Sequence, residues 1–215
     1  MRKNSPIPVP ASLLERAAYW RNRPMLLFLL AAFPAVLAAG SLYDAFLLSL
    51  ITLVLTVATQ TVLSFVAGRM AQWARILCAA LLSAGVMTGL YPLIGLCFPD
   101  FFERTLFVLP MLVLQPMVLP LGDARLFALP PKTAVWDALV RSAFFAAVVL
   151  VCGLLREFLA YGSVFGVALL GEDAALLPAF AEPFGGFALL GLEAALVQGI
   201  FRRYRHKKAE GGREE

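Results

Sequence analysis

Two short apolar stretches share a proline-centred pattern and are the segments best suited to form a buried site. The first, residues 33–40, reads FPAVLAAG, and the second, residues 115–122, reads QPMVLPLG, 82 residues further on. Their hydrophobic runs, 25–39 and 106–121, would reach only about 22 to 24 Å as helices, less than a bilayer's roughly 30 Å apolar core. Matching short, broken segments in two halves of a membrane chain indicate an internal repeat whose discontinuous helices meet at a buried site.

An acidic side chain in the last apolar segment is a second candidate. Glu193 falls near the middle of segment 184–201, where a comparable ionised group costs about 2.5 to 3.5 kcal/mol to insert. Such a carboxyl needs a partner or a proton, so Glu193 is a candidate carrier of protons or cations. An interior glutamate that is neutral or paired and has no transport role is the alternative.

One face of the apolar segment 45–67 carries hydroxyl and amide groups at helical spacing. These residues are Ser49, Thr52, Thr56, Thr59 and Gln60. Close packing between membrane helices explains this pattern most simply, because serine and threonine allow helices to approach and to hydrogen-bond across the contact. An ion path along this face is the alternative.

Arg156 and Glu157 are adjacent residues of opposite charge within the apolar segment 138–159. Adjacent residues point in different directions on a helix, so these two side chains are not expected to pair with each other. We expect Arg156 to extend outward to the membrane surface or to brace an outer loop.

Composition requires that these residues sit in a membrane. With 61% hydrophobic and 15% charged residues in 215 positions, the chain cannot coat a soluble domain with polar side chains. Turn residues separate the apolar segments at Gly40-Ser41, Pro99-Asp100 and Pro130-Pro131. Three cysteines, Cys78, Cys97 and Cys152, lie in apolar segments and are expected to pack as small core residues.

The predicted fold is an all-α membrane protein of six elements, arranged as two inverted three-helix repeats whose first helix is short or broken. The elements are 25–39, 45–67, 76–98, 106–121, 138–159 and 184–201. An N-terminal segment (1–24) precedes the membrane domain (25–201), which divides into repeat one (25–98) and repeat two (106–201), and a basic tail (202–215) follows. The stretch 161–183 is expected to be irregular and to lie on the outer face.

Basic residues predict the orientation. With six elements both termini share one side, and that side holds sixteen of the eighteen lysines and arginines. Because basic residues in short loops stay in the cytoplasm, both termini are predicted to be cytoplasmic, in a bacterial inner membrane. The basic run 202–208 follows a membrane helix directly, so it is interpreted as a contact to anionic lipid of the bilayer and not as a nucleic-acid site.

The stretch 154–166, LLREFLAYGSVFG, resembles a known signature. It is similar to the L-R-E-x-x-G-x-G-T-L-F-G pattern of the Rnf/Nqr membrane subunits, on the RnfE and NqrD side. Asp137-Ala138-Leu139, Gly185-Gly186-Phe187 and the threonine-rich run to Gln60 agree in order with that family. The resemblance covers most of the chain and is weak between residues 68 and 105.

This resemblance implies a six-helix subunit of an ion-pumping electron-transfer complex. One option is that the chain is a non-catalytic subunit of an NADH- or ferredoxin-linked oxidoreductase. Its partner would be a sister membrane subunit of opposite topology, similar to RnfA or NqrE. In the family, half-helices of the two subunits supply cysteines to a two-iron two-sulfur cluster. The positions that match those cysteines here are Phe33 and Gln115, or Pro116 in place of Gln115 if the register is shifted by one. None of these side chains can replace a thiolate, so no cofactor, metal or catalytic residue is predicted on this chain.

The leading hypothesis is therefore a diverged subunit of an Rnf/Nqr-like complex that couples electron flow to Na⁺ or H⁺ movement. The alternative is a secondary transporter, in which Gln60, Glu193 and the helices broken at Pro34 and Pro116 surround a small solute or ion. A structural membrane protein without a transport role is a third class.

Overall fold

The computed structural model describes residues 32–66, 70, 72–118, 130–168 and 177–211. The predicted N-terminal segment (1–24), the end of the 106–121 run and the last residues of the basic tail lie outside the described residues. The described part of the tail continues helix α8, which spans Pro183–Gly211.

Long apolar helices dominate the described part of the chain. Three are long and apolar enough to cross a membrane, namely α3 (Leu42–Val66), α4 (Gln72–Cys97, apolar from Ala74) and α7 (Pro131–Tyr161). The first part of α8, Pro183–Leu196, is a shorter apolar stretch. They correspond to the predicted segments 45–67, 76–98, 138–159 and 184–201. Large apolar side chains remain on their outer surfaces, such as Leu81 at 75% and Leu96 at 82% exposure, as expected where lipid or a partner covers them.

The fourth predicted element is short, as the sequence indicated, whereas only residues 32–39 of the first lie among the described residues. The described part of the first is helical over 32–38, and the chain leaves the helix at Ala39 and Gly40 before α3 begins. The fourth is a 3₁₀ helix, η2 (Leu109–Leu114), followed by a four-residue helix, α6 (Gln115–Val118). The position of the first break was wrong in detail, because Pro34 lies inside the helix and Gly40-Ser41 interrupts it.

Two predicted connections are more ordered than expected. The linker proposed at Pro99-Asp100 begins a helix, α5 (Pro99–Thr105), with proline in its first turn, where no backbone N–H is needed. The irregular stretch 161–183 contains an antiparallel hairpin, β1 (Ser163–Val164) with β2 (Val167–Ala168), and a 3₁₀ helix, η4 (Pro178–Ala181).

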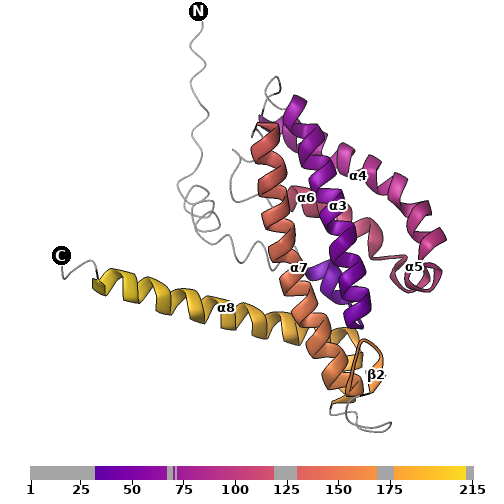
Figure 1. Cartoon of the computed structure of the whole chain (residues 1–215), viewed down its shortest axis with the longest axis vertical. Helices are drawn as coiled ribbons and strands as arrows, with labels where there is room; N and C mark the ends of the chain where they lie inside the picture. Colours follow the sequence, from indigo (N-terminus) through magenta and orange to yellow (C-terminus); the bar gives the residue numbers. More distant parts are fainter. Residues whose placement is uncertain (1–31, 67–69, 71, 119–129, 169–176, 212–215) are drawn as a thin grey trace, which may run out of the picture.

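Helix α3 forms the centre of the bundle, with α7 packed along one side and α4 against the other (Figure 1). The first residue of α3 meets the end of α7, since the Leu42 N–H donates to the Glu157 carboxylate at 2.7 Å. The two helices are therefore antiparallel. Helix α8 begins beside the end of α7 and projects away from the bundle, contacting α7 and η4.

Candidate functional site

Arg156 lies at the point where helix 32–38, α7 and the connection 161–183 meet. Its Nη1 donates to the carbonyl oxygens of Val36, Leu37 and Ala39 at 3.3, 3.3 and 3.1 Å. Its Nε and Nη2 donate to the carbonyls of Phe180 and Ala181 in η4 at 3.0 and 2.9 Å. The whole residue is 4% exposed. The guanidinium therefore joins two segments that are far apart in sequence.

These bonds solve a problem that a broken membrane helix creates. The last carbonyls of a helix have no N–H partner within it and carry partial negative charge, and in an apolar environment each needs a donor. The guanidinium supplies several donors in a rigid plane and places its charge at this end of helix 32–38. Of the two alternatives expected for Arg156, the structure shows contact with the connection 161–183 and a buried side chain that does not extend to the surface.

Glu157 ties a different set of groups together, as its position next to Arg156 predicted. One carboxylate oxygen accepts from the Leu42 N–H at the start of α3 at 2.7 Å. The other accepts from the Gly166 N–H at 2.7 Å and from the Ser163 hydroxyl at 3.3 Å. Glu157 is 2% exposed, so these charge-assisted bonds replace its hydration.

The hairpin bound by Glu157 contains two turn residues with positive φ angles. Phe165 and Gly166 at its turn both have positive φ, at 54° and 74°, which is the two-residue turn that fits the twist of a hairpin. Gly162, which ends α7, also has positive φ at 63°. The residues of the sequence signature thus share one structural role: they join the end of α7 to the start of α3, the end of helix 32–38 and the connection 161–183.

Changing Glu157 to glutamine should destabilise this junction. The amide keeps one acceptor oxygen but presents an NH₂ group to either Leu42 N–H or Gly166 N–H, so at least one charge-assisted bond, worth about 1.5 to 3 kcal/mol, is lost. The heat-denaturation midpoint of the fluorescently tagged chain, measured by size exclusion in mild detergent, should fall by several degrees. Glu103→Gln, at an exposed position, is the control, and an equal midpoint for E157Q and wild type would contradict this role.

The start of α3 has further stabilising contacts that were not predicted. The Ser41 hydroxyl accepts from the Asp44 N–H at 3.1 Å and so caps the helix. The Asp44 carboxylate, in the first turn, pairs with Arg104 at the end of α5 at 3.2 Å. The Ser-x-x-Asp pattern at 41–44 is a recognisable capping signal in the sequence, and it follows the break directly.

The second break is held by a weaker donor. Gln60 of α3 donates its amide Nε2 to the Pro116 carbonyl at 3.3 Å, so the structure brings together two of the predicted site residues. The neighbouring Gln115 is 1% exposed. The Ser83 hydroxyl of α4 donates to the Val113 carbonyl of η2 at 2.7 Å. Carbonyl groups of both broken segments, helix 32–38 and η2–α6, therefore accept hydrogen bonds from side chains of neighbouring long helices.

The positions that match the family's cluster cysteines do not fit an iron–sulfur cluster. Phe33 offers no donor atom; its ring is 44% exposed and stacks on Phe187 of α8, with centroids 4.9 Å apart. Gln115 offers an amide, which is not the thiolate that such clusters use. Within the described residues no group of three or more histidine, cysteine or acidic side chains could hold a metal. No step of electron transfer is assigned to a cluster ligated by this chain.

Glu193 of α8 is a buried acidic side chain. It is 8% exposed, and neither carboxyl oxygen has a hydrogen-bond partner among the described residues by the geometry of the contacts. The Cys152 thiol of α7 faces it. Arg156, one turn further along α7, is occupied by backbone carbonyls. The buried acid expected in the last apolar segment is thus present, and the structure does not pair it with a described cation.

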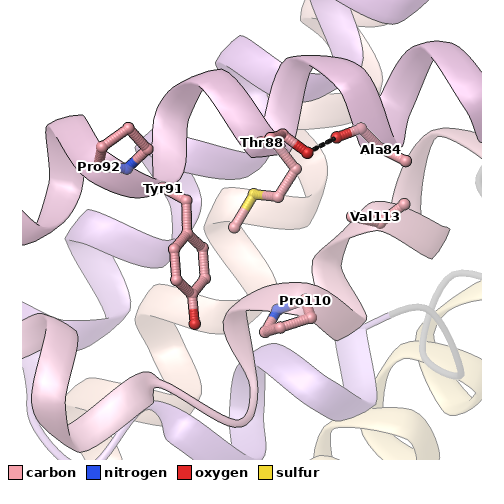
Figure 2. A pocket seen from close by; sticks show the side chains of 7 residues that line it. Ala84, Thr88, Tyr91, Pro92, Pro110 and Val113 are labelled. Carbon is pink, nitrogen blue, oxygen red and sulfur yellow. Dashed lines mark hydrogen bonds between the residues drawn. The ribbon is translucent and has the colours of Figure 1, made fainter.

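A groove of about 410 Å³ opens between α4 and η2 (Figure 2). Its lining is almost entirely apolar, and Tyr91 projects from α4 toward the η2 segment, where its hydroxyl donates to the Leu106 carbonyl at 3.3 Å. Pro92, inside α4, also lines the groove. The groove has none of the charged groups that mark a site of chemistry.

Comparison with known proteins is consistent with this arrangement. Residues 13–193 match the family described as Rnf-Nqr subunit, membrane protein. The chain is 28% identical over 202 residues to the E component of the ion-translocating oxidoreductase complex of Pseudomonas paraeruginosa, covering 87% of this chain and 84% of that protein. It is 25% identical over 204 residues to the protein of the same name from Thioalkalivibrio sulfidiphilus, covering 88% and 89%. This chain therefore belongs to the Rnf-Nqr subunit family of multi-pass membrane proteins.

Proposed function

We propose that this chain is the E-type membrane subunit of an ion-translocating oxidoreductase complex. The observation that carries this proposal is the match over residues 13–193 together with relatives of that name aligned over most of their length. The proposal is supported by the roles of Arg156 and Glu157, because the signature residues form the junction that holds the broken helix.

The finer proposal is a pair of inverted halves with both termini in the cytoplasm. The antiparallel contact of α3 with α7, the corresponding first long helices of the two halves, supports it. So does the Asp44–Arg104 pair, because both residues belong to connections that the charge pattern puts on the outer side. The outward-facing apolar surfaces leave room for a sister subunit of opposite topology.

Within such a complex this chain is a scaffold, and other subunits carry out the electron transfer. Its own breaks carry Phe33 and Gln115, so any cluster at the shared centre would need ligands from elsewhere in the complex. Glu193 is proposed as a group that exchanges a proton or cation, on the basis of its burial and its unpaired oxygens.

Copurification tests the assignment. The tagged chain, extracted from its native membranes in mild detergent, should bring down a sister membrane subunit and flavin-bearing subunits, identified by mass spectrometry and by flavin and iron analysis. A chain that elutes alone, remains stable and moves a solute in vesicles without an electron donor would instead support the secondary transporter.

A further inference from the structure

Four hydroxyl groups in the interior of the bundle have no hydrogen-bond partner among the described residues. They belong to Thr52, Thr56 and Thr59 of α3 and to Ser142 of α7. Each of these residues is 0 or 1% exposed. An unpaired hydroxyl in an apolar interior costs free energy, so four in one helix contact require an explanation.

Other hydroxyls in the same helices are paired, which makes these four stand out. Ser49 donates to the Ala45 carbonyl at 2.7 Å, and Thr61 to the Val57 carbonyl at 2.6 Å. On α4, Thr88 donates to the Ala84 carbonyl at 2.8 Å in the same way. Bonding to the carbonyl one turn back is therefore the ordinary arrangement in the described helices, and the side chains of the four do not adopt it.

The register of the two helices places Thr56 and Ser142 at one level of their contact, with Thr59 about one turn further along α3. Thr52, Thr56 and Thr59 lie on the buried face of α3, about one helical turn apart. A methyl group at Gly153 of α7 would lie 2.6 Å from the Ala45 side chain, which fixes the register of the antiparallel pair. Thr56 lies eleven residues after Ala45 and Ser142 eleven residues before Gly153, so the two residues reach the same level of the contact.

The end of the second broken helix adds oxygens at this level. Gln60 follows Thr59 on α3, and its contact with the Pro116 carbonyl brings α6 against this part of the helix. The last carbonyls of a short helix carry partial negative charge and favour cations. The hydroxyl groups at positions 56, 59 and 142 therefore lie beside a helix end that attracts positive charge.

We propose that Thr56, Thr59 and Ser142, with backbone oxygen at the end of α6, form a binding site for a monovalent cation of the size of Na⁺. Hard cations prefer oxygen ligands, and a discontinuous helix end that coordinates Na⁺ is a recurrent design in membrane proteins. The hydroxyl oxygens are sealed from water, which favours a small dehydrated ion. The significance of the site for ion translocation rests on the proposed function, but its existence does not.

The groups around the site suit a monovalent cation better than a divalent one. The nearest carboxylate along α7, Asp137, is paired with Arg141 at 2.8 Å, so the two together are neutral. Divalent ions usually require ligating carboxylates, and none of the proposed ligands is one. None of them titrates in the physiological range either, which argues against a proton site.

Sodium-dependent stability of the tagged full-length chain in its purified complex tests the site. A cation that binds only the folded state raises the free energy of unfolding by RT ln(1 + [Na⁺]/Kd), so the denaturation midpoint keeps rising with the logarithm of the concentration above the Kd. We expect the midpoint to rise with NaCl relative to choline chloride at equal ionic strength. In T56V and S142A the Na⁺ concentration that gives the same rise should be about tenfold higher, the change expected for about 1.4 kcal/mol of lost binding energy.

T61V is the matched control, because it removes a hydroxyl that is already bonded to its own helix, and T56S should keep the wild-type response because it retains the oxygen. Equal midpoints in NaCl and choline chloride for wild type, or an unchanged Na⁺ response in T56V and S142A, would overturn the site. Either result would leave copurification intact, so failure of this site is distinguishable from failure of the proposed function.

Discussion

Replacing Arg156 with alanine should lower the free energy of unfolding by about 3 kcal/mol or more and remove most of the folded chain from the membrane. The guanidinium donates to five backbone carbonyls, and its loss leaves these groups without a donor in an apolar interior. That cost is a large part of a typical domain's stability. The amount of tagged chain in detergent extracts and its denaturation midpoint measure the effect.

R156K should recover only part of the stability, because an ammonium group is compact and cannot reach both helix 32–38 and η4 in one plane. Arg104→Ala is the matched control. The Arg104 side chain is 59% exposed and forms a surface pair with Asp44, so its removal should cost no more than about 1 kcal/mol. Equal effects of R156A and R104A would contradict the role given to Arg156.

Adding one methyl group at Gly153 should separate the two central helices. The new Cβ would lie 2.6 Å from the Ala45 side chain, closer than side-chain carbons approach, and at a tight 3.2 Å from the Ser41 carbonyl. G153A is therefore expected to cost about 1 to 3 kcal/mol, the usual cost of overpacking, and G153L more. The same midpoint measurement detects this.

The double variant G153A/A45G should restore much of the lost stability, because it moves the methyl group from α3 to α7 without changing the volume of the contact. A methyl group at Gly85 or Gly89 of α4 meets nothing within 4 Å, so G85A and G89A should be close to neutral. The role of the α3–α7 contact would be contradicted if A45G did not restore the stability of G153A and if G85A lost as much stability as G153A. Stability would then depend on glycine content and not on this contact.

The sequence predicted the long helices well because their apolar length leaves few alternatives. The segments 45–67, 76–98 and 138–159 correspond to α3, α4 and α7. The second proline-centred run correctly predicted short helices, η2 and α6. The helix at 99–105 was missed because proline was taken as a turn residue, although it also suits the first turn of a helix.

Side-chain roles were predicted less completely, for a physical reason. Adjacency on a helix correctly separated Arg156 from Glu157, but the partners of both are backbone groups, which sequence patterns do not identify. A guanidinium near a membrane surface usually extends to water, and here the carbonyls of a broken helix compete successfully with water. Gly153 gave no signal by itself, because the residue that it accommodates, Ala45, is more than a hundred positions away.

The absence of thiols at 33 and 115 and the presence of Arg156 and Glu157 separate two properties of the family. The arginine and the glutamate hold the broken helix and the start of α3, whereas a cluster ligand serves chemistry at the helix itself. We therefore propose that this chain keeps the scaffold and its place in the membrane while electron transfer depends on other subunits.

Redox-driven cation uptake tests the proposed function most directly. Inverted membrane vesicles that contain the complex with this chain should accumulate Na⁺ or H⁺ when NADH or reduced ferredoxin is supplied. Vesicles from cells that lack the chain should not, and expression of the chain should restore uptake. Uptake that persists without the chain, or transport by the isolated chain with no electron donor, would contradict its assignment to an ion-translocating oxidoreductase complex.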